Sequence, residues 1–542
     1  MNWIHDHLPI LPVLLPSATA IVLLLLGDHG GEDAAHGHRK LLWARRLGLG
    51  SVLLGLVIAA ALVADAAGGE LRAYLVGEWP APYGIAIVID RLGALMLLLT
   101  SLVALPVLWY ATGGWDSHGR YFHALFQFQL MGLNGAFVTG DLFNLFVFFE
   151  VLLIASYVLM VHGQGAERFR LGLHYVVLNL VASALFLIGV SLLYAKTGTL
   201  NLADLALRVP KVQGPDATVV QAAAWLLLVV FGFKAALLPL SLWLPATYAA
   251  ACAPVAALFA IMTKVGVYSI WRVHGVVFGA DAGASAYTVE PLLLPLALGT
   301  SVVGVLGALA AQTLERLVAW LTVASVGTVL VALGLFNADA WSAGMYYMAN
   351  STLVIAALFL LAELVAAQRG DAADRLVPAS PVAQPTLLGV LLLLTAASAS
   401  GLPPLPGFIG KLMLLEASTA HSWQLAVWIT VLGVGFLTLI GLARAGSVMF
   451  WHVRTDLPEA AASGASPKLI GATLLLIAAT VAMSMFAAPI ERYTAAAALQ
   501  LGDRAAYAQA VLGARGEATE TTRPYTGRVD APAAAASAGG TR

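Results

Sequence analysis

Residues 141–161 read DLFNLFVFFEVLLIASYVLMV. A helix needs about 20 predominantly apolar residues to cross the hydrocarbon core of a bilayer, and this stretch supplies them. Its one charge away from the ends is Glu150, about nine residues from either end and therefore near the bilayer midplane. Both features, apolar length and a charge within it, recur along the chain and decide its interpretation.

The composition of the whole chain is that of a membrane protein. Of the 542 residues, 60% are hydrophobic and 11% are charged, whereas soluble chains carry about 25% charged residues. The net charge of −1 gives no basic field that would favour nucleic acid. The single cysteine, Cys252, excludes disulfide scaffolds and cysteine-ligated metal clusters.

Apolar runs repeat from residue 8 to about residue 488. They are continuous, whereas the strands of a membrane barrel alternate in polarity over about ten residues. The sequence therefore predicts an all-α polytopic membrane protein with about 14 transmembrane helices. The expected spans lie near residues 8–27, 47–66, 92–111, 121–140, 142–161, 173–194, 218–240, 254–273, 289–311, 316–336, 343–367, 385–416, 423–450 and 469–488.

Basic residues in the short loops predict the orientation. The first loop contains Arg39, Lys40, Arg45 and Arg46, and most other Lys and Arg residues of the loops fall on the same side. Cytoplasmic loops are enriched in these residues, so we expect the first loop in the cytoplasm and both termini outside. The N-terminus lacks the basic region of a signal peptide and is interpreted as a first span.

Four charged residues lie inside apolar runs: Glu150, Lys234, Lys264 and Lys411. Placing a charge at the centre of a membrane helix costs about 2.5–3.5 kcal/mol on the lenient insertion scale. The purely structural alternatives are an ion pair between helices and a long side chain that reaches the membrane interface. Glu150 and Lys234 are too far from a helix end to reach the interface, which favours a functional role.

Two of these charges lie next to predicted helix breaks. Pro239 and Pro245 follow Lys234, and Pro403, Pro404, Pro406 and Gly407 precede Lys411. Proline inside a span frees a backbone carbonyl, and irregular backbone in a membrane is tolerated only inside protein or along a cavity. Breaks in corresponding spans of two halves indicate inverted repeats with sites at the midplane.

The breaks fall in about the seventh and twelfth spans, which predicts two inverted five-helix repeats. The expected organisation has five parts. They are helices 1–3 (1–120), the first repeat (121–278), the second repeat (279–453), helix 14 (454–490), and a short amphipathic segment followed by a disordered tail (491–542).

Proton movement is the chemistry that these residues suit. A Glu150–Lys234 contact modulated by hydration could pass a proton, and Lys264 and Lys411 could continue the relay through hydroxyls such as Ser241 and Thr263. No phosphate loop, hydride-carrier motif or nucleophile triad is evident, so no cofactor and no enzymatic activity are expected. The first loop, GDHGGEDAAHGHRK, contains His29, His36 and His38; we interpret it as a solvated tract and predict no metal site.

Several stretches resemble the antiporter-like subunits shared by respiratory complex I and the multisubunit Mrp cation/proton antiporters. They are LFNLFVFFEVLLIASYVLM, FGFKAALLPLSLWLP, APVAALFAIMTKVGVY, LERLVAWLTVASVG and GLPPLPGFIGKLMLL. The resemblance covers most of residues 85–450, and Lys411 and the segment from Pro489 to Gly513 make it greatest for the D-type subunits of Mrp complexes. One departure is LPATYAAACAP, where Ala246 replaces the usual Asp.

The resemblance implies fourteen helices with the seventh and twelfth broken, and proton transfer through Glu150, Lys234, Lys264 and Lys411. It also implies assembly with other Mrp subunits in a bacterial inner membrane, exchanging Na+ (or Li+ or K+) for protons. Because Glu150 is the one carboxylate clearly deep in a span, we expect Na+ itself to pass through a neighbouring subunit.

Two alternatives remain open at this point. The chain could be a proton-pumping arm of complex I or of a membrane-bound hydrogenase, in which electron transfer elsewhere drives the same relay. It could also be a scaffold that transports nothing and holds partner subunits. The first predicts a gradient built from a reductant, and the second predicts no effect of neutralising Glu150 and Lys234.

Overall fold

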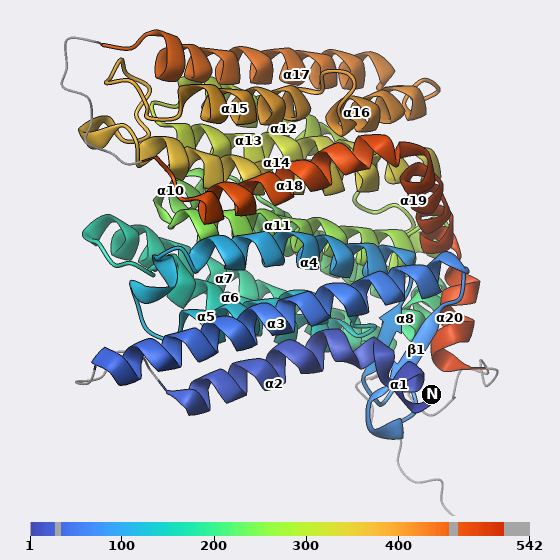
Figure 1. The fold of residues 1–542 in the computed structure, drawn as a ribbon. Helices are drawn as coiled ribbons and strands as arrows, with labels where there is room; N and C mark the ends of the chain where they lie inside the picture. Colours follow the sequence, from blue (N-terminus) through green and yellow to red (C-terminus); the bar gives the residue numbers. More distant parts are fainter. Residues whose placement is uncertain (1, 28–33, 455–463, 514–542) are drawn as a thin grey trace, which may run out of the picture.

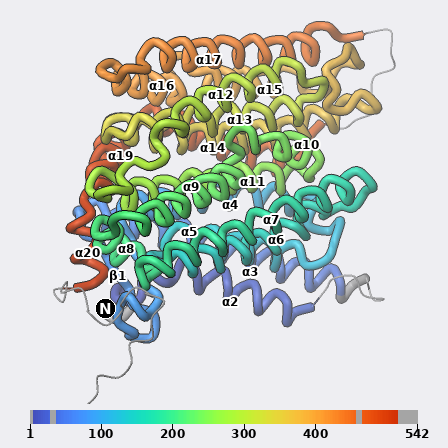
Figure 2. The backbone as a smooth tube through the Cα atoms, turned by 180° about the vertical axis from the view of Figure 1, so that it is seen from behind, coloured from blue at the N-terminus to red at the C-terminus, as the bar shows by residue number. Residues whose placement is uncertain are grey.

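The computed structural model describes residues 2–27, 34–454 and 464–513, and within them the chain is almost entirely helical. Figures 1 and 2 show the long helices side by side in rows, from α2 at one edge to α17 at the other. We call the end of the helices at which the N-terminus lies the N-terminal face. The opposite end, where α2 (Leu11–Leu26) ends and α3 (Ala34–Ala67) begins, is the basic face.

The N-terminal helices are α1 (Asn2–His7), α2 (Leu11–Leu26), α3 (Ala34–Ala67) and α4 (Arg91–Ala111). Between α3 and α4 the chain forms a short antiparallel sheet that the sequence did not predict. Its strands are β1 (Arg72–Leu75) and β2 (Ala86–Ile89), with Arg72 opposite Ile89. The sheet lies at the N-terminal face, where β2 is buried against the helix ends.

The next group contains the first predicted break. Its helices are α5 (Phe122–Val138), α6 (Leu142–Met160), α7 (Ala166–Thr197), α8 (Leu202–Arg208), α9 (Pro215–Ala235), α10 (Trp243–Ala250) and α11 (Ala253–Ile270). A π-helical turn, Trp271–Val277, extends α11 at the N-terminal face.

The third group contains the second predicted break. Its helices are α12 (Glu290–Ala310), α13 (Leu314–Gly334), α14 (Ala338–Ala366), α15 (Pro385–Ser400), α16 (Pro406–Ala417) and α17 (Gln424–Gly446). The chain then returns across the molecule through α18 (Pro467–Met485), α19 (Ala487–Gly502) and α20 (Arg504–Leu512).

Twelve helices of the described residues are long and apolar enough to cross a membrane, which confirms the polytopic helical class. Two predicted spans are represented by shorter helices: α5 has 17 residues, and the region 385–416 is divided into α15 and α16. The total of fourteen, the inverted relation of the repeats and the domain boundaries stay predictions. Short helices follow residue 486, and the amphipathic character predicted for that segment stays a prediction. His29 and the tail from Arg515 onward lie outside the described residues.

The centre of the molecule is formed by α11, α13 and α14. The most apolar stretch of α11 is entirely buried and those of α13 and α14 are 94% buried, whereas those of α2 and α17 are 39% buried. Lys264 belongs to α11, α9 packs against α11, and α16 packs against α14. The predicted lysines therefore lie in the protein interior, where a bare ammonium group needs polar partners.

Candidate functional site

The first break begins one residue after α9 ends. Ala236 has a left-handed backbone with φ of 64°, and the Leu237 amide donates to the Gly232 carbonyl at 2.7 Å. This is the hydrogen-bond pattern of a Schellman helix end. The Leu238 amide then donates to Thr300 Oγ1 of α12 at 2.9 Å, so the irregular backbone is satisfied from a neighbouring helix. Lys234 lies in the last turn before this break.

The second break has the same local structure. Gly401 has φ of 85°, and the Leu402 amide donates to the Ala397 carbonyl at 2.9 Å. Here the lysine follows the break: Lys411 Nζ donates to the Ser400 carbonyl at 2.7 Å and approaches the Ala399 carbonyl at 3.4 Å. These carbonyls belong to the last turn of α15, which has no intrahelical donors of its own. The ammonium group thus binds the backbone that the break exposes.

Glu150 and Lys234 are joined through α7 and not by a direct contact. Ser183 Oγ donates to Glu150 Oε1, and Lys234 Nζ donates to Asn179 Oδ1 at 3.0 Å. Asn179 and Ser183 are four residues apart and so share one face of the helix. Among the described residues no ion pair joins Glu150 to Lys234, which corrects the expectation of a direct contact. The Lys234 ammonium also lies 5.6 Å from the centre of the Phe149 ring.

Lys264 is fully buried, and its ammonium nitrogen donates to Ser325 Oγ of α13 at 3.4 Å. Two residues along α11, Gly266 lets α9 approach closely. A Cβ atom at this position would lie 2.5 Å from the Ala235 amide nitrogen and 2.7 Å from the Phe231 carbonyl oxygen. The absence of a side chain therefore brings the backbones carrying Lys234 and Lys264 together.

A small cavity lies between Ser325, the hydrogen-bond partner of Lys264, and Lys411. Its volume is about 20 Å³, enough for one water molecule. Ser325, Tyr347, Asn350 and Lys411 are among its lining residues. Asn350 Oδ1 accepts a hydrogen bond from Ser398 Oγ at 2.8 Å, but Asn350 Nδ2 is buried without a partner. A polar, water-sized space thus connects the two lysine environments.

The remaining predicted residues have structural positions. Pro245 is buried in α10, Pro239, Pro403 and Pro404 lie in the two breaks, and Pro406 is in the first turn of α16. A Cβ atom on Gly407 would overlap the Ser398 carbonyl oxygen, so this glycine permits α16 to pack against α15.

The hydroxyls proposed from the sequence are not the ones that contact the charges. Ser241 Oγ is buried without a partner, and Thr263 Oγ1 donates within α11. The side chains that contact the charges are those of Asn179, Ser183 and Ser325, which the sequence analysis did not identify. A signal was present for two of them, because Asn179 and Ser183 form a polar pair at helical spacing in an apolar run. No group of three or more His, Cys, Asp or Glu residues suited to a metal ion occurs in the described part of the chain.

The chain was compared with known proteins. Residues 139–438 match the family described as NADH:quinone oxidoreductase/Mrp antiporter, TM. The D-type subunit of a probable K(+)/H(+) antiporter from Rhizobium meliloti (strain 1021) is 40% identical over 547 residues, covering 95% of this chain and 98% of the relative. The D-type subunit of the Na(+)/H(+) antiporter from Alkalihalophilus pseudofirmus is 35% identical, covering 94% of this chain and 99% of the relative.

Among solved structures, a chain of the Mrp complex from Dietzia sp. DQ12-45-1b superimposes with a TM-score of 0.82 at 27% identity. The match covers 94% of this chain and 99% of the Dietzia chain. Sequence and fold therefore agree over nearly the whole length.

Proposed function

Because this chain belongs to the NADH:quinone oxidoreductase/Mrp antiporter family, as an antiporter subunit of the D type, we propose that it carries protons across the membrane for a complex exchanging them for a monovalent cation. The polar groups from Glu150 to Lys411 are the proposed route. The transporter as a whole is a hetero-oligomer, and this chain is one of its multi-pass membrane subunits.

The observation that carries the proposal is the set of partners around the three lysines. Lys234 contacts an amide oxygen, Lys264 a hydroxyl and Lys411 backbone carbonyls, and each ammonium group is buried. Ion-paired ammonium groups would have to separate from a carboxylate before exchanging a proton. Lysines held by neutral oxygens need only exchange hydrogen-bond partners, as a relay through side chains and water requires.

Each part of the route has a chemical role in this proposal. Glu150 accepts and releases the proton at one end, with Ser183 donating to its carboxylate. Lys234 and Lys264 pass it across the central helices, and Ser325 and the 20 Å³ cavity lead to Lys411. A water molecule in that cavity would bridge the two lysine environments.

The coupled cation is a separate part of the proposal. The Rhizobium relative is named for K+ and the Alkalihalophilus relative for Na+, so both ions belong in the test. A proton-pumping arm of a redox enzyme is the second candidate, since the family description includes NADH:quinone oxidoreductase.

The test is cation-dependent pH recovery in everted vesicles from antiporter-deficient cells that express the whole gene cluster. Wild-type complex is expected to exchange Na+ or K+ for protons. Lys234→Ala and Glu150→Gln are expected to assemble and to lose roughly tenfold or more of the rate, since each removes a proton-carrying group.

A matched pair of serines sharpens this experiment. Ser183→Ala removes the hydroxyl that contacts Glu150 and is expected to slow exchange severalfold. Ser191→Ala lies eight residues further along α7, where its hydroxyl is exposed and donates within the helix, and is expected to leave the rate unchanged.

Other outcomes would point to the alternatives. A gradient built only when a reductant is supplied would assign the chain to a redox pump. Full exchange by assembled complexes carrying both Lys234→Ala and Glu150→Gln would leave the chain a scaffold.

A further inference from the structure

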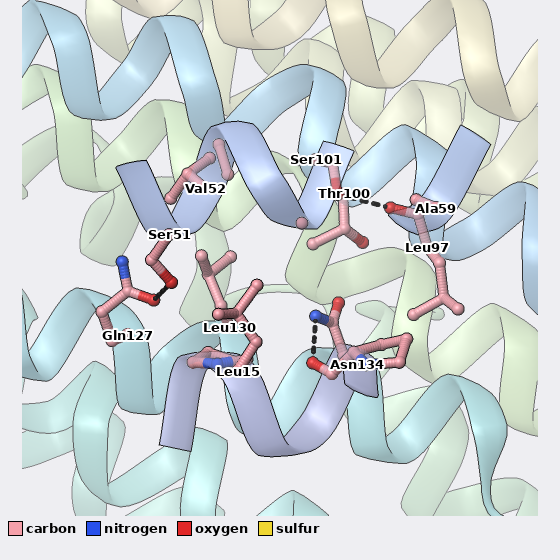
Figure 3. A pocket seen from close by; sticks show the side chains of 14 residues that line it. Leu15, Ser51, Val52, Ala59, Leu97, Thr100, Ser101, Gln127, Leu130 and Asn134 are labelled. Atoms are coloured by element: carbon pink, nitrogen blue, oxygen red, sulfur yellow. Dashed lines mark hydrogen bonds between the residues drawn. The ribbon is translucent and has the colours of Figure 1, made fainter. Parts of the chain in front are cut away.

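A second small cavity lies among the N-terminal helices, away from the lysines. It is enclosed by α2, α3, α4 and α5 and has a volume of about 20 Å³. Ser51, Thr100, Ser101, Gln127 and Asn134 are its polar lining residues. Figure 3 shows Thr100 and Asn134 facing each other across this space, with Ser51 and Gln127 on one side.

The hydroxyl groups around the cavity have already used their hydrogens. Thr100 Oγ1 donates to the Met96 carbonyl at 2.7 Å, Ser101 Oγ to the Leu97 carbonyl at 3.0 Å, and Ser51 Oγ to Gln127 Oε1 at 3.1 Å. Ser51 Oγ also accepts from Thr19 Oγ1 at 3.1 Å, so it keeps one free lone pair. A hydroxyl has one hydrogen and two lone pairs. These three groups can therefore offer the cavity only oxygen lone pairs.

Asn134 adds a fourth oxygen for a reason that begins in α2. Pro16 has no amide hydrogen, so the carbonyl of Pro12, one turn earlier, loses its helical donor. Asn134 Nδ2 replaces that donor at 2.8 Å, which turns the amide so that its nitrogen faces the backbone of α2. Asn134 Oδ1 is buried and has no partner.

Gln127 is fixed in the same way. Its nitrogen donates to the Gly48 carbonyl at 3.1 Å, and its oxygen accepts from Ser51. Both amide nitrogens near the cavity are thus directed at backbone carbonyls, whereas uncharged oxygens converge on the space. Among these oxygens Asn134 Oδ1 has no partner, and a buried acceptor of this kind needs a positive partner or a hydrogen-bond donor.

We propose that this cavity binds one dehydrated monovalent metal cation, Na+ or K+, through the oxygens of Ser51, Thr100, Ser101 and Asn134. Hard cations prefer oxygen ligands, and neutral carbonyl oxygens can replace the hydration shell of a monovalent ion within a membrane. A water molecule would also fit this space and could donate its two hydrogens to these oxygens, so it is the alternative occupant that the test must exclude.

The site would change the expectation drawn from the scarcity of deep carboxylates, because its ligands carry no charge. Binding of the cation does not depend on the proposed proton route, whereas a role for the site in exchange rests on the proposed function. The two are tested by separate measurements.

The binding test uses the purified, assembled complex. Its thermal unfolding midpoint is measured in NaCl, KCl and choline chloride at equal ionic strength. An ion that binds the folded state raises the midpoint. Wild type is expected to show a shift with Na+ or K+ relative to choline, and Thr100→Val and Asn134→Leu are expected to reduce it.

Two control variants separate binding from general stability. Thr100→Ser keeps the oxygen and is expected to retain the cation-dependent shift even if the midpoint itself falls. Gln129→Leu removes a buried amide from the same helix, outside the cavity lining, and is also expected to retain the shift. If Asn134→Leu does not assemble, the Thr100→Val and Thr100→Ser pair decides.

The transport measurement is the apparent KM for the cation in everted vesicles. Thr100→Val is expected to raise it roughly tenfold, the scale of one lost ligand, with the proton dependence unchanged. Equal cation-dependent shifts in wild type and Thr100→Val would overturn the site and leave a water-filled cavity. Absence of any exchange by wild type, with the shift retained, would overturn the proposed function and leave the site standing.

Discussion

Asp116 illustrates how single residues are held at the basic face. It lies in the turn between α4 and α5 and is fully buried. Its carboxylate accepts from Arg45 Nε at 2.7 Å, Arg45 Nη2 at 2.8 Å and His123 Nε2 at 3.0 Å. Burial by itself raises the pKa of Asp116, but these hydrogen bonds and charges outweigh it and lower the pKa to about 2.

This pKa predicts a specific acid sensitivity. Since the folded pKa is depressed from an ordinary value near 3.9, the cluster stabilises the fold above about pH 4, and this contribution is lost as the pH falls toward 2. The shift corresponds to about 2.5 kcal/mol at most. Thermal unfolding of detergent-solubilised protein between pH 7 and pH 2, followed by tryptophan fluorescence, should show a steeper loss for wild type than for Asp116→Asn. Parallel curves for the two proteins would contradict it.

Only some of the individual site residues could be predicted from the sequence. Glu150, Lys234, Lys264 and Lys411 could be identified because a charge in a membrane span is costly enough to need a reason. Asn179 and Ser183 gave only the weak signal of a polar pair at helical spacing, and Ser325 gave none, because serine and asparagine are common between membrane helices and cost little. Their importance depends on which side chain faces them, which only the packing of α6, α7, α9, α11 and α13 determines.

At the scale of elements, the sequence predicted where the two helix breaks lie, but not the backbone conformation that ends each helix. Prolines indicated where α9 and α15 stop, yet each helix ends before its prolines, and the left-handed residue that follows it is Ala236 or Gly401. Alanine is an uncommon residue in a left-handed conformation, so no residue type near Ala236 indicated that the helix would end there. The close approach of α9 to α11 was likewise hidden, since Gly266 lies in an ordinary apolar run.

Gly266 therefore carries an element-scale prediction. Gly266→Ala must separate α9 from α11, because all three nearest atoms to the new Cβ atom belong to the backbone of α9. We expect a stability loss of about 1–3 kcal/mol and slower exchange, because Lys234 and Lys264 move apart. Thermal unfolding and vesicle transport would measure both. Gly433→Ala in α17 is the control, since no atom lies within 4 Å of the added Cβ there; equal effects of the two substitutions would refute the close-approach argument.

At the scale of the whole molecule, α19 and α20 cross the N-terminal face and connect parts that are distant in sequence (Figure 1). The Arg91 amide at the start of α4 donates to Gln500 Oε1 at 2.9 Å, and Gln500 Nε2 donates to the Gly69 carbonyl, after α3, at 3.1 Å. Thr494 Oγ1 lies 2.9 Å from Ser342 Oγ of α14, within hydrogen-bond distance. Arg504 donates to the Ala206 carbonyl of α8. The segment thus holds the N-terminal helices and both predicted repeats together.

Gln500 is the residue whose loss should show this most directly. Gln500→Leu leaves the Arg91 amide, one of the helix-start donors without an intrahelical acceptor, and the Gly69 carbonyl without their partner. We expect a destabilisation of about 1–3 kcal/mol, seen as a lower thermal unfolding midpoint of the purified complex. The exchange rate of folded complexes should stay unchanged, because the lysine route lies in the interior. Gln509→Leu makes the same change on the exposed face of α20 and should leave the midpoint where it is. Equal midpoints for the two variants would mean that α19 covers the helix ends without holding them.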